Sequence, residues 1–253
     1  MDEEVMATFK RLKNKVALDY AATIKCELYG KEYYCDFSEV FDIDEDVLEK
    51  SLKPNKWTLL HEQIEYSILD GISYSLRKAG DVVYEEIYED LDAFHVRYKR
   101  HENYRGKDFH SYLCRLYERE VCPDLVPNVF NILFADRETM RQFNLVIADK
   151  ISELKKEDWP DYLRRDGVMK RCTYWPSWLK NALFRREQGH CASCQKDLTG
   201  LLSNEKSIAI DHIVPLNLGG VNDSTNFQIL CSTCNTEKGG DKTDTSDLYS
   251  PFW

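Results

Sequence analysis

The stretch 209-AIDHIVPLNLGGVNDSTNFQILCSTCNTEKGG-240 carries an unusual set of polar side chains for so short a segment. It contains an Asp-His pair, a Gly-Gly pair, the run NFQIL, and a Cys-x-x-Cys pair followed by asparagine. Carboxylate, imidazole, amide and thiolate groups are the side chains that bind metal ions in proteins. The stretch therefore indicates a metal site rather than an ordinary surface loop.

A second Cys-x-x-Cys pair, 191-CASC-194, lies upstream, and thirty-six residues separate it from 231-CSTC-234. Two thiolates two residues apart can hold one ion from a tight turn, and two such turns complete a tetrahedral shell. The alternative is a pair of redox-active motifs, but no thioredoxin-like strand–helix pattern precedes either pair. We predict a structural zinc ion bound by Cys191, Cys194, Cys231 and Cys234.

The cysteine count also bears on the compartment. Nine cysteines are an odd number, which fits a reducing environment better than a disulfide framework. Met1 is followed by Asp-Glu-Glu rather than by a basic and apolar leader, and no run of about 18 apolar residues could cross a membrane. We expect a cytoplasmic protein without membrane contact. The cysteines outside the two pairs are interpreted as buried thiols, namely Cys26, Cys35, Cys114, Cys122 and Cys172.

The first two-thirds of the chain has the pattern of a mostly helical region. In residues 56–79 one apolar residue recurs every fourth position, which predicts a helix that Gly80 ends. Residues 107–119 and 136–155 also fit helices, whereas residues 21–41 fit either a helix or a hairpin. The apolar stripe consists of Leu60, Ile64, Ile68, Ile72 and Leu76.

A boundary is expected between residues 158 and 176, where two Trp-Pro pairs resist helix continuation. Pro176 suits the first turn of a following helix, which Gly189 ends. Trp178, Ala182 and Leu183 are expected to face inward, and Arg185 and Arg186 to lie in its last turn. We divide the chain into a helical domain, residues 1–170, and a second domain, residues 171–253.

The segment between the two cysteine pairs is expected to form a hairpin. Residues 207–215 have the alternation of a strand, Gly219-Gly220 suits a turn, and residues 224–230 lead back to the second pair. Asn235 would begin the next helix. A hairpin packed on that helix would bring Asp211 and Asn235 close together.

Residues 176–240 resemble an HNH endonuclease of the ββα-metal class. The resemblance covers about the last quarter of the chain, and residues 1–170 resemble no family that we identify. In place of the final histidine common in this family the sequence has asparagine, which gives a His-Asn-Asn subtype; an amide oxygen can still bind a hard divalent ion. The matching residues are Asp211-His212-Ile213, Pro215, Gly219-Gly220, Asn226 in NFQIL, and Cys231-x-x-Cys234-Asn235-x-x-Lys238-Gly239.

The resemblance implies an α+β fold and a set of catalytic roles. His212 would be the general base that activates water. Asp211 and Asn235 would bind one catalytic Mg²⁺ or Mn²⁺ ion. Asn226 would orient the hairpin through bonds to the backbone, and Lys238 would contact a phosphate. Arg185 and Arg186 are further candidates for nucleic-acid contact.

Charge argues partly against such a substrate, because the formal net charge is −10 and nucleic acid is usually bound by Lys and Arg. Only −2 belongs to residues 176–253, which hold seven basic and nine acidic residues. Two basic segments occur, at residues 97–107 and 164–171. Both fit solvated helix faces, and the first, with its interleaved tyrosines, also fits phosphate contact.

These observations favour a metal-dependent endonuclease that acts on nucleic acid, with DNA the preferred substrate. Residues 1–170 would gate the nuclease, or bind a protein partner or regulatory ligand. By association with the fold alone, the chain suits the nuclease effector of a prokaryotic antiviral defence system. Two alternatives remain: a catalytically silent zinc module in an adaptor that binds nucleic acid or protein, and a partner-binding helical protein that the zinc unit only caps.

Overall fold

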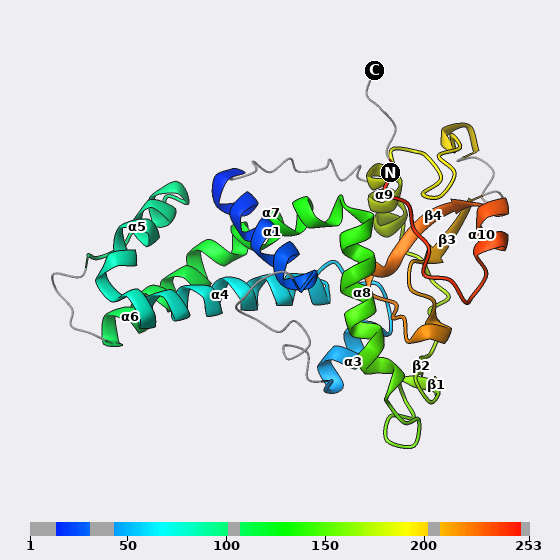
Figure 1. Ribbon diagram of the computed structural model, residues 1–253, viewed down its shortest axis with the longest axis horizontal. Coiled ribbons are helices and arrows are strands. Elements are labelled where there is room, and N and C mark those ends of the chain that lie inside the picture. Colours follow the sequence, from blue (N-terminus) through cyan, green and yellow to red (C-terminus); the bar gives the residue numbers. More distant parts are fainter. Residues whose placement is uncertain (1–13, 31–42, 101–106, 202–207, 249–253) are drawn as a thin grey trace, which may run out of the picture.

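The computed structural model describes residues 14–30, 43–100, 107–201 and 208–248. In Figure 1 the helical amino-terminal part lies on one side, a small sheet lies on the other, and α8 stands between them. The helices of the amino-terminal part are α1 (Asn14–Leu28), α3 (Glu45–Ser51), α4 (Leu59–Ala79), α5 (Tyr84–Ala93), α6 (Lys107–Leu116), α7 (Cys122–Phe134) and α8 (Arg137–Ser152), with a 3-10 turn at Gly80–Val83 and a π-helical turn at Tyr117–Val121.

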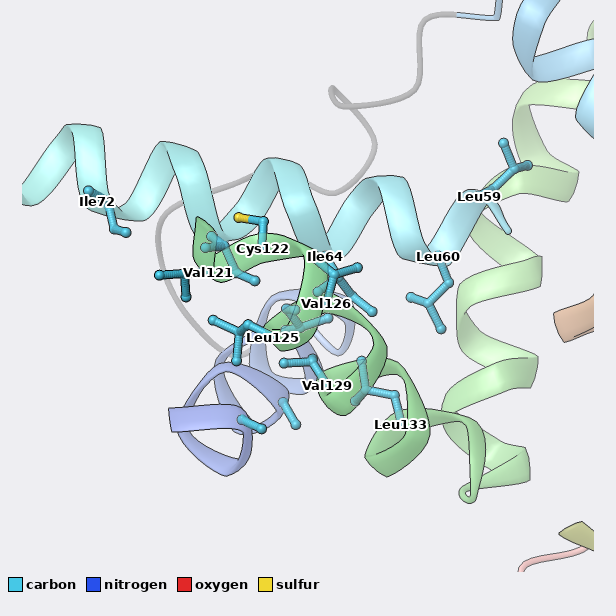
Figure 2. Close-up of a cluster of buried hydrophobic side chains, with 14 of the residues drawn as sticks. Leu59, Leu60, Ile64, Ile72, Val121, Cys122, Leu125, Val126, Val129 and Leu133 are labelled. Carbon is cyan, nitrogen blue, oxygen red and sulfur yellow. The ribbon is translucent and has the colours of Figure 1, made fainter. Parts of the chain in front are cut away.

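Helix α4 confirms the apolar stripe expected in residues 56–79. Thr58 caps its first turn through a reciprocal arrangement with His61, and Gly80 ends it with φ +56°. All five stripe residues are buried. Figure 2 shows labelled side chains of α4 and α7 pointing toward one another across this interface. Each fully buried Leu or Ile contributes roughly 1.5–3 kcal/mol relative to an exposed one.

The other helical expectations hold with shifted ends. The helix expected over residues 107–119 is α6, which continues into the π-helical turn and then α7. The helix expected over residues 136–155 is α8, which Asp136 caps by accepting from the backbone of Glu138 and Thr139. Residues 21–41 fitted either a helix or a hairpin. Of these, the residues up to Leu28 belong to helix α1, residues 29 and 30 form a turn, and residues 31–41 lie outside the described residues.

The carboxyl-terminal part has two antiparallel hairpins and two helices. The expected strand over residues 207–215 is β3, and Ile208 pairs with Cys231 and His212 with Phe227 across the β3–β4 register. Asn235 lies in the middle of α10 rather than at its start. The elements are β1 (Leu163–Arg165), β2 (Val168–Met169), α9 (Ser177–Arg186), β3 (Ile208–His212), β4 (Phe227–Cys231) and α10 (Ser232–Lys238), with 3-10 turns at Thr199–Leu201, Leu216–Leu218 and Ser224–Asn226.

Two apolar clusters support this arrangement. The larger one runs through the helices and reaches Leu163, Met169, Ile213 and Val221. It therefore includes part of the loop between β3 and β4. The smaller cluster combines α9, β4 and the cysteine pairs, with buried Leu179, Leu183, Cys191, Ala192, Leu198, Phe227, Ile229, Leu230, Cys231 and Cys234.

Two glycines let the loop approach its neighbours closely. A Cβ at Gly219, which has φ +82°, would lie 2.3 Å from the carbonyl oxygen of Ala148 in α8. A Cβ at Gly220 would lie 1.9 Å from the carbonyl oxygen of Val214. Only glycine fits at such distances. The predicted Gly-Gly turn is therefore also the point where the loop contacts α8.

Two expectations about side-chain burial need correction. Helix α9 fully buries Leu183, as expected, and also Leu179, because it presents this face to β4. Trp178 packs against the smaller cluster but is only half-buried, and Ala182 is half-buried as well. Among the described cysteines outside the two pairs, only Cys122 is buried; Cys26 is exposed, and Cys114 and Cys172 are intermediate. Cys35 lies outside the described residues.

The α+β fold class is confirmed, with a mostly helical amino-terminal part followed by a small two-stranded unit with a four-cysteine cluster. Within the part of the chain that the structure describes, no helix has the length and apolar character needed to cross a membrane.

Candidate functional site

The four cysteines of the two Cys-x-x-Cys pairs form one cluster. Their sulfur atoms all lie within 4.8 Å of one another, and Cys194 Sγ is 3.9 Å from Cys231 Sγ. In a tetrahedral zinc site the ligand sulfurs are about 3.8 Å apart, since each Zn–S bond is about 2.3 Å. The donor set and its dimensions therefore fit one zinc ion.

Backbone groups hold the cysteine turns in place. The amide of Cys231 donates to Cys191 Sγ at 3.3 Å, and the amide of Cys234 donates to Cys231 Sγ at 3.5 Å. The amide of Ala192 donates to the carbonyl of Ile229 at 2.8 Å, which joins the first pair to β4. Burial raises the pKa of the Cys234 thiol to about 12, so a metal ion has to displace its proton.

Asp211 and His212 end β3 beside a buried ammonium group. Lys238 Nζ, from α10, lies 3.0 Å from Asp211 Oδ2 and donates to the carbonyl of His212 at 2.7 Å. Gln228 Nε2, opposite Asp211 in the sheet, donates to the same Oδ2 at 3.0 Å. Within the described residues Asp211 Oδ1 accepts no hydrogen bond. One carboxylate oxygen thus remains for a divalent cation, a hard ion that prefers oxygen ligands.

The His212 ring is buried, with its Nε2 atom 3.2 Å from Asn222 Oδ1. The Asn222 amide nitrogen donates to the carbonyls of Lys170 and Ser51, at 2.8 and 3.2 Å. Its Oδ1 also accepts from the backbone of Cys172 at 3.1 Å. Because Oδ1 is an acceptor, His212 Nε2 carries the proton and Nδ1 has the free lone pair.

The environment of His212 favours its neutral form. Burial lowers the pKa of His212 to about 4, and the nearby cations Arg171 and Lys238 act in the same direction. Phe227 and Trp175 flank the ring, with centroid distances of 4.8 and 6.1 Å. At neutral pH the imidazole is therefore unprotonated, which is the form that a general base needs.

Asn226 is fully buried at the base of the same loop. Its amide nitrogen donates to the carbonyls of Val214 and Val221, at 2.9 and 2.8 Å, and its Oδ1 accepts from the backbone of Val214 at 2.8 Å. The backbone carbonyl of Asn226 accepts from Ile213 at 2.7 Å. These bonds close the loop directly behind His212.

A cavity of about 190 Å³ opens beside Asp211 and His212. Gly239 and Gly240, just after α10, form part of its wall. Arg164 and Arg171, from the β1–β2 hairpin and the chain that follows it, also line the cavity. Asp211, His212, Arg164 and Arg171 thus line one solvent-accessible space.

The remaining predicted residues lie elsewhere. Asn235 is half-buried on α10, does not line the cavity, and makes no hydrogen bond to Asp211 within the described residues. Arg185 is exposed on α9. Arg186 is buried and donates to Glu187 Oε1 and, at 2.5 Å, to the carbonyl of Phe227. Arg186 is therefore not available for the predicted contact with nucleic acid, because its buried guanidinium bonds Glu187 and the carbonyl of Phe227.

Three features escape the sequence analysis. Asn222 and Gln228 stand within the quoted stretch, but nothing in their spacing indicates that they bond His212 and Asp211. The basic segment 164–171 stands out by composition, yet its approach to the cavity depends on the turn that β1 and β2 make. Lys238 contacts Asp211 in the structure, which its spacing did not indicate, and its contact with a phosphate stays a prediction.

Comparison with known families agrees with the resemblance noted in the sequence. Residues 191–246 match the family model described as HNH endonuclease. No curated protein and no solved structure shows a match to the chain. The HNH assignment is thus confirmed for the carboxyl-terminal segment. Helix α9 and the β1–β2 hairpin lie outside the matched residues.

Proposed function

We propose that the chain is a metal-dependent endonuclease that hydrolyses phosphodiester bonds, with DNA as substrate. The observation that carries the proposal is the cavity beside Asp211 and His212, within a segment that matches HNH endonucleases and contains a four-cysteine cluster. A module that only binds would not need an acidic and a basic catalytic group side by side at a cavity.

His212 acts as the general base in this proposal. Its Nδ1 accepts a proton from water, the water oxygen bonds to phosphorus, and the bond from phosphorus to the 3′ oxygen breaks. The 3′ oxygen takes its proton from solvent, which leaves 5′-phosphate and 3′-hydroxyl ends. Asn222 accepts from Nε2–H and so holds the ring in the tautomer that this step needs.

Two metal ions belong to the proposal. Cys191, Cys194, Cys231 and Cys234 would hold the zinc ion, which fastens the two turns together. Asp211 would offer its Oδ1 to Mg²⁺ or Mn²⁺, and Asn235, on α10 outside the cavity lining, would have to turn toward that ion to be its second protein ligand. When bound, this ion stabilises negative charge on the phosphate and on the departing oxygen. Lys238 neutralises Asp211 in the structure, and we propose that it contacts the phosphate once that ion is bound.

The amino-terminal part is proposed to regulate the nuclease. The loop that contains Asn222 is bonded to the junction between α3 and α4: Ser224 Oγ donates to the carbonyl of Asn55 at 2.6 Å, and Asp223 Oδ2 accepts from the backbone of Leu59 at 3.1 Å. A partner or ligand that moves this junction would move the group that orients His212. The role of such gating in prokaryotic defence against viruses rests on association with the fold alone.

Plasmid cleavage tests the proposed function. Purified full-length chain is incubated with supercoiled plasmid and Mg²⁺, Mn²⁺ or Ca²⁺, and the product ends are labelled with polynucleotide kinase before and after phosphatase treatment. We expect cleavage with Mg²⁺ or Mn²⁺ and ends that accept label only after phosphatase. Absence of cleavage under all metal conditions by zinc-loaded protein would contradict the proposal.

A catalytically silent zinc module is the second candidate. The observation that favours it is the ion pair of Lys238 with Asp211, which neutralises the carboxylate expected to bind the catalytic cation. This candidate predicts a zinc-loaded chain that binds nucleic acid or a protein partner and leaves plasmid intact.

A further inference from the structure

The β1–β2 hairpin lies outside the segment that matches the HNH family, yet it brings two arginines to the cavity. Arg164 belongs to β1, and Arg171 follows β2 closely. Asp211 and His212 line the same cavity. The hairpin and the HNH segment are therefore two sides of one space.

The β1–β2 hairpin is packed against the larger apolar cluster and the carboxyl-terminal end of α8. Leu163 and Met169 are fully buried in the larger apolar cluster. Gly167, with φ +64°, donates from its amide to the carbonyl of Leu154 at 2.9 Å, and a Cβ there would lie 2.6 Å from the carbonyl oxygen of Ser152. The side chain of any other residue would push the hairpin off the end of α8. The arginine backbones are thus fixed before any ligand arrives.

Asp166, at the tip of the hairpin, adds to this attachment. Its carboxylate accepts from the backbone of Lys156 at 3.0 Å and pairs with Lys155 Nζ at 3.3 Å. The acidic residue nearest to the two arginines in sequence therefore points back toward the loop after α8. It does not neutralise Arg164 or Arg171.

The two arginines have no carboxylate partner among the described residues, although the chain has ten more acidic than basic residues. Other arginines of the chain are paired: Arg141 with Glu138, and Arg137 with Glu187. Arginine prefers planar oxyanions and binds phosphate in bidentate fashion. Exposed guanidinium groups at a cavity, without an acidic partner, are placed for an anion from outside.

The other basic segment, residues 97–107, is less suited to this role. Arg100 pairs with Glu85 at 3.3 Å and lies over the ring of Tyr88, 4.9 Å from its centroid. In Figure 1 the helix α5 that contributes both partners lies at the opposite end of the molecule from β3 and β4. A phosphate bound there would be remote from His212.

We propose that the β1–β2 hairpin is a clamp for the nucleic-acid backbone, in which Arg164 and Arg171 bind the phosphodiester groups that flank the scissile phosphate. The inference rests on the proposed nuclease function and extends it to substrate binding. Local arginines at the site compensate for the acidic charge of the rest of the chain, which would otherwise repel the strand. DNA and RNA share this phosphodiester chemistry, and duplex DNA is the expected ligand.

Binding can be tested separately from cleavage. Fluorescence anisotropy measures binding of full-length protein to a labelled 20-base-pair DNA duplex without added Mg²⁺, at several salt concentrations. We expect Arg164→Gln and Arg171→Gln each to weaken binding about tenfold, and each to lower the log–log salt slope by about 1. Arg119→Gln, which changes an exposed arginine with 73% side-chain exposure far from the cavity, should bind like the wild type.

Conservative variants and other ligands sharpen the test. Arg164→Lys and Arg171→Lys keep the charge but lose the bidentate fork, and should bind with intermediate affinity. Single-stranded DNA and RNA of the same sequence distinguish the source of the phosphodiester. Stronger binding of RNA would assign the clamp to RNA and contradict the choice of duplex DNA.

Cleavage and binding results separate the two proposals. If wild-type protein cleaves plasmid but the glutamine variants bind duplex like the wild type, the clamp is wrong and the nuclease stands. If wild-type protein binds duplex through these arginines but never cleaves, the clamp stands and the nuclease is wrong. Wild-type protein that binds no nucleic acid overturns the clamp.

Discussion

The helical part and the HNH segment of this molecule are stabilised by different kinds of contact. Between α4 and α7 the interior is made of aliphatic side chains such as Ile64, Leu125 and Val129. In the loop before β4 the buried side chains are instead polar, and Asn222, Asp223, Thr225 and Asn226 are all fully buried. Apolar packing tolerates a change of partner, whereas a buried polar group costs free energy unless it finds its own partner. Substitution of a buried side chain is therefore expected to cost more free energy in this loop of the HNH segment than between α4 and α7.

Removal of zinc should have the largest effect on this comparison. A structural zinc ion supplies on the order of 10 kcal/mol toward folding a small unit. Chelation, or Cys234→Ser, is expected to raise hydrogen exchange in residues 191–201 and 208–231 to unprotected levels while α4 and α7 stay protected. Cys26→Ser, which changes an exposed cysteine outside the cluster, is the control. Equal loss of protection in both regions would show that the helical part depends on zinc as much as the HNH segment does.

Glu187 holds the two regions together through a buried ionic triad. Its Oε2 accepts from Arg137 of α8 at 2.6 Å, and its Oε1 accepts from Arg186 of α9 at 2.6 Å. Glu187→Gln removes the buried carboxylate that both guanidinium groups share, so we expect a loss of about 3–5 kcal/mol in the free energy of unfolding by urea. Glu138→Gln breaks a half-exposed pair with Arg141 and should cost less than about 1 kcal/mol. Similar costs for the two variants would argue against the buried triad.

The helical region should respond to acid through His61. Burial lowers the pKa of His61 to about 4, and its Nδ1 already accepts from the backbone of Thr58 at 3.1 Å. Above about pH 6.5 the ring is neutral in both states; between about 6.5 and 4 only the unfolded chain takes up the proton, so stability falls as pH falls. The loss is on the order of 3 kcal/mol by pH 4.

His61→Gln keeps an acceptor at the capping position and removes the titration. Urea unfolding of this variant should therefore show a weaker decline between pH 6.5 and 4 than the wild type. His212, which is also buried with a lowered pKa, remains in the variant and accounts for the residual decline. An identical pH dependence in the two proteins would contradict the role of His61.

Asn222 should have a clear effect on catalysis, in addition to the stability cost of losing its buried hydrogen bonds. It accepts from the His212 ring while bonded to Ser51 of the helical region, so Asn222→Ala frees the ring to rotate. We expect a fall in kcat of about tenfold or more with little change in KM. Asn181→Ala, on the exposed face of α9, is the control. A rise in KM with unchanged kcat would show that Asn222 acts on substrate binding rather than on ring orientation.

The sequence predicts the features that depend on local spacing. The apolar residues at every fourth position from Leu60 to Leu76 predict α4, and the two Cys-x-x-Cys pairs predict the sulfur cluster. Each of these patterns can be recognised from residue spacing alone. The partner of Asn222 is different. Ser51 is 171 residues away from Asn222, and no local pattern encodes that bond.

The same reasoning explains the errors. Arg186 fits an exposed last turn by helical spacing, but Glu187 and the carbonyl of Phe227 draw its guanidinium inside. Trp178 fits the inner face of α9 as well as Leu179 does, and only the position of β4 selects Leu179. The approach of Arg164 to His212 likewise needs the whole fold, since the hairpin is set by contacts with α8.

The role of His212 as the general base is tested by the cleavage rate of His212→Ala on supercoiled plasmid with Mg²⁺. The comparison is made with wild type and with His95→Asn, a change at an exposed histidine with φ +57°, after equal zinc content and equal circular dichroism are verified. We expect His212→Ala to lose cleavage by at least about a hundredfold, while His95→Asn cleaves like the wild type. Retained cleavage by a folded, zinc-loaded His212→Ala protein would contradict this role of His212.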